Sequence, residues 1–363
     1  MRVVLTGGGT GGHIYPALAV AKEVSRQEPQ AAFLYIGSKH GLEAQIVPRA
    51  GIPFESVEIV GLKRKLTLDN VKTLWKFFRA VSASKQMLQR FRPDVVIGTG
   101  GYVCGPVVYA AARLGIPTII HEQNVVPGLT NKFLTRFVDK VAVSFPESLS
   151  FFPRSKSVLT GNPRATEVMH GDERAGRSFL GIGGDKRIVL MFGGSRGAKA
   201  INEAVLSIVP ELEQFEDTHF VYVTGEVHYE AITAALREKG DLPRNISLLP
   251  FVHNMPDVLA ATHVLVSRAG ASTLAEITAL GIPAILIPSP YVTNNHQEKN
   301  ARGLEKEGAA EVILERELTG ERLRQSLTRL LSDRKRWASM REASLKLGMP
   351  QAATEIYRLM KSL

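Results

Sequence analysis

The sequence contains no long hydrophobic run. No stretch reaches the about 18 apolar residues of a membrane-spanning helix without a charge or a cluster of Gly and Pro. The amino terminus, MRVVLTGGGTGG, also lacks the apolar core and the small-residue cleavage site of a signal peptide, because glycines interrupt it at once. We therefore expect a first β-strand here, no membrane span, and only peripheral contact with any membrane.

Cysteine and metal-binding motifs are scarce as well. The single cysteine, Cys104, cannot form an internal disulfide, which fits a reducing compartment such as the cytoplasm. The patterns D-x-D and H-E-x-x-H are missing, and the nine histidines are scattered. Neither a divalent ion held by carboxylates nor a zinc site is predicted. We expect the protein to work without a metal or another cofactor.

Acidic residues are scarce in the first part of the chain. Residues 1–160 hold 20 Lys and Arg but 10 Asp and Glu, whereas residues 161–363 hold 25 of each, so the net charge of +10 lies entirely in the first part. This asymmetry predicts an anionic partner for the amino-terminal region: nucleic acid, acidic lipid or a phosphorylated substrate. Charge alone does not choose among them.

The length and the strand pattern predict the fold class. A chain of 363 residues with 44% hydrophobic content suits two domains. Short β-branched runs alternate with helical patterns, and the alternation restarts after about residue 160. Continuous apolar strands between helices indicate parallel sheets buried on both faces, so we expect an α/β protein with two doubly wound, Rossmann-like domains. Their predicted bounds are 1–160 and 161–350, with a helix over 351–363 that packs back on the first domain.

A glycine-rich loop, GGGTGGH, occupies positions 7–13 between a predicted strand and a helix. Its backbone N–H groups and the helix dipole favour an anionic or strongly polar ligand. The loop matches G-x-G-x-x-G, yet a dinucleotide site would need an acid after the second strand, where the sequence reads Gly37-Ser38-Lys39. An NAD site is therefore disfavoured, and a merely tight turn is the remaining alternative.

Two segments of the second domain indicate further ligand contacts. The turn GGSRGAKAIN at 193–202 opens a helix, and its Ser195 can hydrogen-bond a phosphate. The stretch 267–301 carries Glu276, which could accept hydrogen bonds from ribose hydroxyls, although periodicity alone favours a solvated acid on a helix face. Arg164, in GNPRA, could neutralise a leaving group or form a surface ion pair.

Two motifs of the first domain end predicted strands. They are GTGGYVCGP at 98–106 and HEQN at 121–124. Because ligands bind at the carboxyl ends of parallel strands, both motifs are expected at the ligand edge of the sheet. Glu122 is a candidate partner for a cationic or hydroxyl-bearing group, and a structural role is the alternative.

The segment 61–81 combines basic and apolar residues at helical spacing. This pattern is typical of a helix lying on an anionic membrane. A buried helix with a basic solvated edge is the alternative. The apolar positions are Leu68, Val71, Leu74, Trp75, Phe78 and Val81, and the basic ones are Lys63, Arg64, Lys65, Lys72, Lys76 and Arg79.

The motifs together resemble one family over nearly the whole chain. GGGTGGHIYPALA, GTGGYVCGP, HEQN, GNPR, FGGSRGA, SRAGASTLAEI and HQEKNA occur in the order found in the MurG family. This resemblance implies a two-domain GT-B fold and transfer of N-acetylglucosamine from UDP-N-acetylglucosamine (UDP-GlcNAc) to lipid I, undecaprenyl-pyrophosphoryl-MurNAc-pentapeptide, giving lipid II. It also implies a peripheral protein at the cytoplasmic face of the bacterial membrane, with other cell-wall synthesis proteins as partners and no nucleic acid.

The resemblance also assigns residues. Its acceptor contacts would be Tyr102 and His13, and its membrane patch would include Trp75 and Phe78. His296 stands where the family often has a glutamine, so only its neighbour Gln297 is carried over. Phe251 and Met255 would flank the uracil. The donor set would be Thr10, Gly11, Gly12, Asn124, Arg164, Ser195, Val252 and Gln297, with Glu276 on the ribose.

We expect an inverting, single in-line displacement at the anomeric carbon, which needs a base for the acceptor hydroxyl. His13 is the first candidate, because imidazole titrates near neutrality, and Glu122 is the second. Three other classes remain as alternatives: a UDP-GlcNAc 2-epimerase of the same fold, a dinucleotide-dependent oxidoreductase and an RNA-binding protein. An epimerase would leave the basic amphipathic segment unexplained, and the stacking aromatics of an RNA-binding sheet are not evident.

Overall fold

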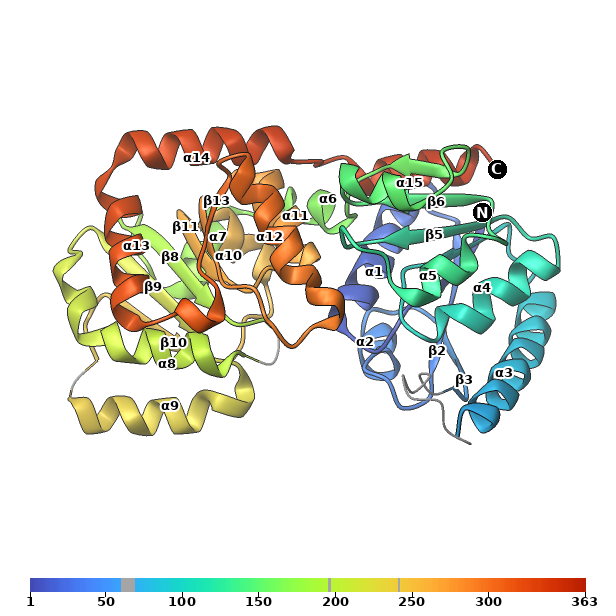
Figure 1. Cartoon of the computed structure of the whole chain (residues 1–363), viewed down its shortest axis with the longest axis horizontal. Helices are drawn as coiled ribbons and strands as arrows, with labels where there is room; N and C mark the ends of the chain where they lie inside the picture. Colours follow the sequence, from blue (N-terminus) through green and yellow to red (C-terminus); the bar gives the residue numbers. More distant parts are fainter. Residues whose placement is uncertain (60–68, 195–196, 241) are drawn as a thin grey trace. The chain divides into compact units, whose positions relative to one another are not determined.

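The computed structural model describes residues 1–59, 69–194, 197–240 and 242–363, with the backbone alone for residues 69–74 and 239. The chain forms two compact units (Figure 1): a first unit, Met1–Thr166 with Gln351–Leu363, and a second unit, Glu167–Pro350. The boundary predicted after residue 160 follows the last strand of the first unit. The division in the structure lies inside α6 (Arg164–Val168).

The first unit is built on a seven-stranded parallel sheet. Its strand order is β3-β2-β1-β4-β5-β6-β7. Val3, Val4 and Leu5 of β1 are all fully buried, as expected for a strand covered by helices on both faces. The strands are β1 (Arg2–Thr6), β2 (Ala32–Ser38), β3 (Phe54–Val57), β4 (Val95–Gly98), β5 (Thr118–Glu122), β6 (Lys140–Val143) and β7 (Ser157–Leu159).

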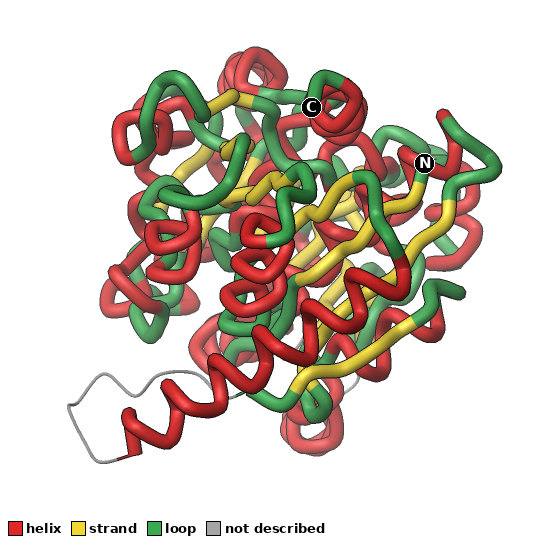
Figure 2. Tube along the Cα trace, turned by 90° about the vertical axis from the view of Figure 1, so that its right-hand side faces the viewer, coloured by secondary structure: helices red, strands yellow, loops and turns green. Residues whose placement is uncertain are grey.

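Helices pack on both faces of this sheet, which Figure 2 shows with its strands in yellow. Val4 and Val96 belong to a core shared with α3 and α4. Their neighbours Val3 and Ile97 belong to a separate core with α1, because successive strand residues face opposite sides. The helices are α1 (Gly11–Gln27), α2 (Glu43–Arg49), α3 (Asp69–Phe91), α4 (Cys104–Arg113), α5 (Leu129–Leu134) and the 3₁₀ segment η1 (Pro146–Phe151).

The last helix, α15 (Ala352–Lys361), returns to the first unit. Ile356 is fully buried in the core beside α1. The Tyr357 hydroxyl and the Lys361 ammonium each donate to a carboxylate oxygen of Glu28 at 3.0 Å. These contacts attach the carboxyl terminus to the segment that follows α1.

The second unit repeats the same architecture with a six-stranded parallel sheet in the order β10-β9-β8-β11-β12-β13. Its strands are β8 (Arg187–Phe192), β9 (Thr218–Val223), β10 (Ile246–Leu249), β11 (Val264–Ser267), β12 (Ala284–Leu286) and β13 (Ala310–Val312). Its helical segments are α7 (Glu173–Leu180), α8 (Lys199–Ile208), η2 (Val209–Gln214), α9 (Glu226–Lys239), α10 (Met255–Ala260), α11 (Ala271–Leu280), η3 (Thr293–Asn295), α12 (His296–Lys306), η4 (Glu315–Glu317), α13 (Gly320–Ser332) and α14 (Arg334–Leu347).

Each sheet reverses its strand order at one place. The reversal lies between β1 and β4 in the first unit and between β8 and β11 in the second. Ligands of doubly wound sheets bind outside the carboxyl ends of the strands at such a switch point. The predicted α/β class with two Rossmann-like domains is confirmed, and the fold directs the search for a site to these two places. Within the described ranges, no helix has the length and apolar character needed to cross a membrane.

Candidate functional site

The loop after β1 lies directly against the loop after β4. The Gly8 N–H donates to the Gly100 carbonyl at 3.2 Å. A Cβ on Gly101, whose φ is +84°, would lie 2.3 Å from the Gly8 carbonyl oxygen, so only glycine permits this approach. The backbone of GGGTGGH is therefore held against GTGGYVCGP, and both motifs lie at the switch point of the first unit.

His13, in the first turn of α1, has a defined ring orientation. Its Nδ1 lies 2.9 Å from the Gly8 carbonyl oxygen and 3.2 Å from the Thr10 hydroxyl. A carbonyl can only accept, so Nδ1 carries the proton and the neutral ring keeps its lone pair on Nε2. A Cβ on Gly100 would lie 2.7 Å from Cδ2 and 3.0 Å from Nε2 of this ring, so a larger residue at position 100 would displace the imidazole.

Glu122 ends β5 and is almost completely buried. One carboxylate oxygen accepts from the Asn124 N–H (3.0 Å) and side-chain amide (3.4 Å). The other accepts from the Gly128 N–H (3.0 Å) and the Asn131 amide (2.9 Å). Both oxygens thus bind the loop that follows the strand, and one of them also binds α5, an arrangement that suits the structural alternative better than proton transfer. Through it Glu122 orients Asn124.

The other two residues of HEQN connect neighbouring loops. The Gln123 amide donates to the Thr99 carbonyl at 2.5 Å and to His121 Nδ1 at 3.1 Å. His121 Nε2 then donates to the Gly161 carbonyl at 3.0 Å. Burial lowers the pKa of His121 to about 4, so its ring is neutral near pH 7 and fixed by both nitrogens. The sequence analysis assigned no role to either side chain.

A buried carboxylate that the sequence analysis missed supports the first glycine loop. Glu43, the first residue of α2, accepts from the Gly9 N–H (3.1 Å) and from the Ser38 N–H (2.9 Å) and hydroxyl (2.5 Å). The search for an acid at the end of β2 found Lys39, but the acid follows four positions later. Its carboxylate binds the Gly9 amide of the glycine loop and is therefore occupied by the protein itself, so the G-x-G-x-x-G match here need not indicate a dinucleotide site.

Arg164 and Tyr102 also lie in the first unit. The Arg164 guanidinium lies 5.4 Å from the ring centre of Tyr15 on α1, and its backbone N–H donates to the Asn162 side chain at 3.1 Å. The Tyr102 hydroxyl lies 3.5 Å from the Ser38 hydroxyl. Thr10, His13, Tyr102, Asn124 and Arg164 therefore all come from segments at the carboxyl edge of one sheet.

The second switch point has its own glycine turn. Gly194 and Gly197 have φ values of +93° and +72°, and a Cβ on Gly197 would lie 2.1 Å from the Thr224 carbonyl oxygen. Glycine is required because this turn meets the loop after β9. Helix α8 begins two residues later, at Lys199. Ser195, the predicted phosphate contact, lies outside the described residues.

Two predicted donor residues, Glu276 and Val252, follow the carboxyl ends of strands in the second unit. Glu276, in α11, is 5% exposed, which excludes the solvated-acid alternative. Val252 is buried in the loop after β10, where the rings of Phe251 and His253 lie 4.9 Å apart and Met255 begins α10.

Gln297 holds the loop after β12. Its side-chain oxygen accepts from the Ser289 N–H at 2.9 Å. The enclosed loop contains Asn294 and Asn295 at φ values of +57° and +49°, a left-handed conformation that non-glycine residues rarely adopt. His296 Nδ1 lies 2.8 Å from the Thr293 carbonyl oxygen. The loop is therefore ordered by contacts within its own segment. Across the described chain, no three His, Cys, Asp or Glu side chains gather as a metal site would require.

An aromatic face covers part of α3, α4 and α5 in the first unit. Trp75 and Phe78 of α3 are 62% and 58% exposed. The Arg79 guanidinium lies 5.5 Å from the Trp75 ring centre. Lys63, Arg64, Lys65 and Leu68 lie outside the described residues. We define the aromatic face as Trp75, Phe77, Phe78, Tyr109, Phe133 and Phe137, the last five of which are linked by ring contacts.

Comparisons with known proteins cover both units. The glycosyltransferase family 28 N-terminal domain matches residues 3–143, and the glycosyltransferase family 28 C-terminal domain matches residues 188–356. A Bacillus cereus protein named UDP-N-acetylglucosamine--N-acetylmuramyl-(pentapeptide) pyrophosphoryl-undecaprenol N-acetylglucosamine transferase 1 is 56% identical over 365 aligned positions, covering 100% of this chain and 99% of that protein. A Halalkalibacterium halodurans protein named as the same transferase is 55% identical, with 99% of each chain covered.

Solved structures with the same fold include enzymes of two kinds. The crystal structure of Acinetobacter baumannii MurG superposes with a TM-score of 0.78 at 31% identity, covering 100% of this chain and 99% of that one. The Neisseria meningitidis UDP-GlcNAc 2-epimerase, bound to UDP-GlcNAc, gives a TM-score of 0.71 at 15% identity over 100% of both chains. The second likeness concerns the fold alone.

Proposed function

The chain belongs to the MurG family of glycosyltransferase family 28, and from this membership we infer that it transfers N-acetylglucosamine from UDP-GlcNAc to lipid I, forming lipid II. The observation that carries this function is the 56% identity over the full chain to relatives named for that transfer. The fold is the GT-B fold of the family. The epimerase alternative has only the fold in its favour, at 15% identity.

We propose His13 as the base of an inverting displacement. The acceptor hydroxyl attacks the anomeric carbon from the face opposite UDP. The bond from this carbon to the β-phosphate oxygen breaks, and its electron pair leaves with UDP. The hydroxyl proton passes to His13 Nε2. The hydrogen bond from Nδ1 to the Gly8 carbonyl supports this role, because it fixes the tautomer and stabilises the imidazolium that forms.

Glu122 is better suited to positioning than to proton transfer. Its four hydrogen bonds, three from the loop after β5 and one from Asn131 of α5, support this role, since a base engaged by four donors would have to give them up. Tyr102 and His13, at the same edge of the sheet, are the proposed acceptor contacts.

The donor set divides between the two units. We propose Glu276 as the ribose partner, which its place in α11 supports, because this helix follows β11 at the carboxyl edge where doubly wound sheets bind their ligands. Phe251 and Met255 are proposed to flank the uracil. The remaining proposed donor contacts are Thr10, Gly11, Gly12, Asn124 and Arg164 of the first unit and Ser195, Val252 and Gln297 of the second.

We propose that the aromatic face binds the anionic inner surface of the cell membrane peripherally. Exposed Trp75 and Phe78 would enter the headgroup region, and Arg79 and Lys132 supply positive charge. Phe133 and Phe137 extend the apolar surface beyond the two residues that the sequence indicated. Such contact would place the acceptor edge of the sheet near its lipid-linked substrate.

The test is release of UDP from UDP-GlcNAc by the purified protein, with and without a lipid I analogue, in the presence of EDTA. Acceptor-dependent release with formation of the disaccharide supports transfer without a divalent metal. UDP release without acceptor, or conversion of the sugar to its 2-epimer, would instead support the epimerase alternative. Activity that EDTA abolishes would contradict the expected independence of metal.

A further inference from the structure

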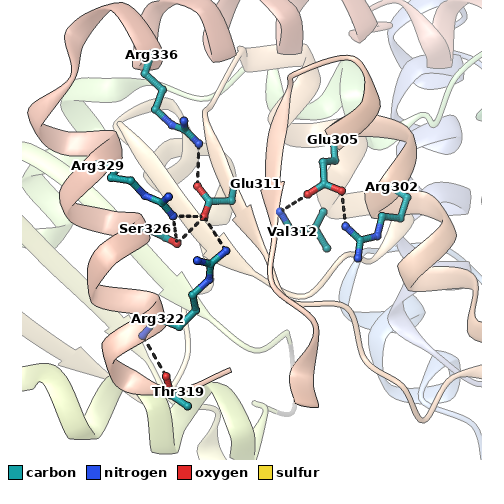
Figure 3. A network of polar contacts seen from close by, with 9 residues as sticks. All are labelled: Arg302, Glu305, Glu311, Val312, Thr319, Arg322, Ser326, Arg329 and Arg336. Carbon is teal, nitrogen blue, oxygen red and sulfur yellow. Dashed lines mark hydrogen bonds and ion pairs between the residues drawn. The ribbon is translucent and has the colours of Figure 1, made fainter. Parts of the chain in front are cut away.

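The edge strand β13 carries a carboxylate that three arginines share (Figure 3). Arg329 donates to one Glu311 oxygen at 2.9 Å, and Arg336 donates to the other at 3.0 Å. Arg322 lies 4.0 Å from the same carboxylate, and the Ser326 hydroxyl donates to it at 2.6 Å. We call Arg322, Arg329 and Arg336 the arginine cluster. Within the described chain, Glu311 is their common carboxylate partner.

Other arginines of the second unit are paired differently. Arg187 binds Asp217 through two hydrogen bonds of 2.7 Å. Arg268 pairs with Glu315, and Arg302 and Arg324 each contact two acids: Arg302 with Glu305 and Glu298, and Arg324 with Glu321 and Glu211. The arginine cluster therefore differs in stoichiometry, with three positive charges on one negative charge. Like charges held together destabilise a surface unless an anion offsets them.

The local charge continues beyond the three side chains. Residues 320–347, which form α13 and α14, contain eight Lys and Arg but three Asp and Glu. The rest of the second unit compensates, which is why the charge of residues 161–363 sums to zero and the sequence analysis found no basic region there. The region is nevertheless basic where it meets solvent, since the cluster side chains are 42–48% exposed while Glu311 is 11% exposed.

We propose that the arginine cluster docks an acidic segment of a partner protein. Guanidinium groups bind carboxylates through paired N–H donors, and each cluster arginine keeps an exposed side beyond its contact with Glu311. Glu311 already occupies the centre of the cluster, so one small anion cannot lie between all three arginines. An extended chain with several carboxylates can instead contact each arginine from outside.

A protein fits this surface better than a membrane. The leucines of α13 all point into the core: Leu323, Leu327, Leu330 and Leu331 are buried. The surface therefore offers charge without the exposed aromatic side chains of α3, which a bilayer contact would use. The proposal is independent of the transfer reaction, because none of the cluster arginines belongs to the donor or acceptor set.

The first experiment measures binding of a fluorescent peptide of ten residues with alternating Glu and Ser, by anisotropy at about 50 mM salt, where exposed charges are weakly screened. The variant E311Q/R322Q/R329Q/R336Q removes the cluster without leaving Glu311 buried and unpaired. The matched control R302Q/R324Q changes the net charge by the same amount, two units. We expect affinity to fall at least about tenfold in the first and less than about twofold in the second.

The second experiment locates the peptide, because the basic first unit will also attract it. A carbodiimide couples peptide carboxylates to lysines, and Lys335 is exposed next to Arg336. Coupling at Lys335 that disappears in the quadruple variant supports the proposal. Coupling confined to lysines of the first unit overturns it, as does equal peptide affinity in all three proteins.

Two further measurements separate loss of the docking site from unfolding of the variant, and binding of an acidic protein segment from binding of lipid or phosphate. Transfer activity and thermal unfolding should match the wild type in the quadruple variant. If the variant unfolds, R329K/R336K replaces it, since lysine keeps the charge and loses the paired donors, and we expect an intermediate affinity. Loss of binding to anionic vesicles with unchanged peptide binding, or displacement of the peptide by inorganic phosphate at equal charge concentration, would overturn the protein-docking proposal.

Discussion

The two units share a topology and differ in their surfaces. Both reverse strand order beside a glycine turn after the first strand of the sheet. The first unit adds the net positive charge, the aromatic face and a histidine with a fixed tautomer. The second adds a buried acid in α11 and ion pairs such as Arg187 with Asp217 and Arg268 with Glu315. One architecture thus supports two kinds of site, and side chains at the sheet edge decide which ligand each site binds.

This difference agrees with a division of labour between acceptor and donor. A lipid-linked acceptor requires membrane contact and a base, and the residues proposed for both roles lie in the first unit. A soluble donor requires neither. If the division is correct, changes in the first unit should alter catalysis and membrane binding, and changes in the second should alter use of UDP-GlcNAc.

The largest effect is expected at His13. His13→Ala should lower kcat by about 10² to 10⁴, because a positioned base contributes that much, while the KM for UDP-GlcNAc changes little. His40→Ala is the matched control, since His40 is an exposed histidine of the same unit, and it should keep full activity. Steady-state kinetics with a lipid I analogue measure both. A fall of less than about threefold would remove His13 as the base, and a comparable kcat loss in Glu122→Gln would assign the role to Glu122.

Substitutions in the two glycine turns test whether the first unit affects kcat and the second affects the KM for UDP-GlcNAc. In Gly101→Ala the new Cβ meets the Gly8 carbonyl, and in Gly197→Ala it meets the Thr224 carbonyl. We expect the first to reduce kcat and the second to raise the KM for UDP-GlcNAc, each by at least about tenfold, because the collision forces the two contacting loops apart. The left-handed backbone adds a cost of about 1–2 kcal/mol in stability.

Gly51→Ala and Gly181→Ala are the controls for the glycine turns. Both positions have positive φ with no atom within 4 Å of a new Cβ, so they carry the backbone strain without the collision. If all four variants lose stability alike and keep their kinetics, the turns serve only the fold. If Gly197→Ala lowers kcat without affecting KM, the proposed division between the units is wrong.

Acid should destabilise both units through one histidine in each, the buried His121 and the half-buried His263. Burial lowers the pKa of His121 and of His263 to about 4, below the 6.5 of the unfolded chain. Protonation therefore favours unfolding, and the stabilisation present above pH 6.5 is lost as the pH falls toward 4. His121 should contribute a loss of about 2 kcal/mol between pH 7 and pH 5. His263 is more exposed, so solvent screening makes its loss smaller.

Urea unfolding at several pH values measures this difference. His121→Gln should reduce the pH dependence of the first unit and leave that of the second unchanged, and His263→Gln should do the reverse. Chemical shifts of the two imidazoles give their pKa values directly. Titration of either ring near pH 6.5 in the folded protein would contradict the expectation.

The fold was predictable because its signals are local. Continuous apolar strands, glycines after the first strand of each domain and alternating helices all lie within short windows of sequence. Contacts across the sheet edge were not predictable in the same way. Glu43 meets the Gly9 amide only once β2 and α2 are in place, and Gln123, after β5, reaches Thr99 at the end of the adjacent strand β4. Both contacts join residues that are far apart in the chain, so no motif in a single sequence predicts them.

The net charge of each part of the chain showed the basic excess of residues 1–160 but did not show the arginine cluster of the second unit. The excess in residues 1–160 was visible because acids are few there, whereas the arginine cluster disappears in a region of equal totals. Periodicity alone also favoured a solvated Glu276, but the helix buries it, because its sequence cannot say which side faces the sheet. Ser195 keeps its predicted role as a proposal.

The smallest effect concerns the aromatic face, and it tests the surface difference between the units directly. Trp75→Ala/Phe78→Ala should weaken binding to anionic vesicles about three- to tenfold, because it removes two exposed aromatic side chains and leaves the basic residues in place. Phe179→Ala in the second unit is the control: its ring is 50% exposed and it lies outside the proposed membrane contact. Vesicle sedimentation measures affinity, and transfer to a water-soluble acceptor should stay unchanged in both variants. An equal loss of vesicle affinity in the two variants would mean that exposed aromatic residues of either unit bind the membrane. The assignment of membrane contact to the first unit would then be wrong.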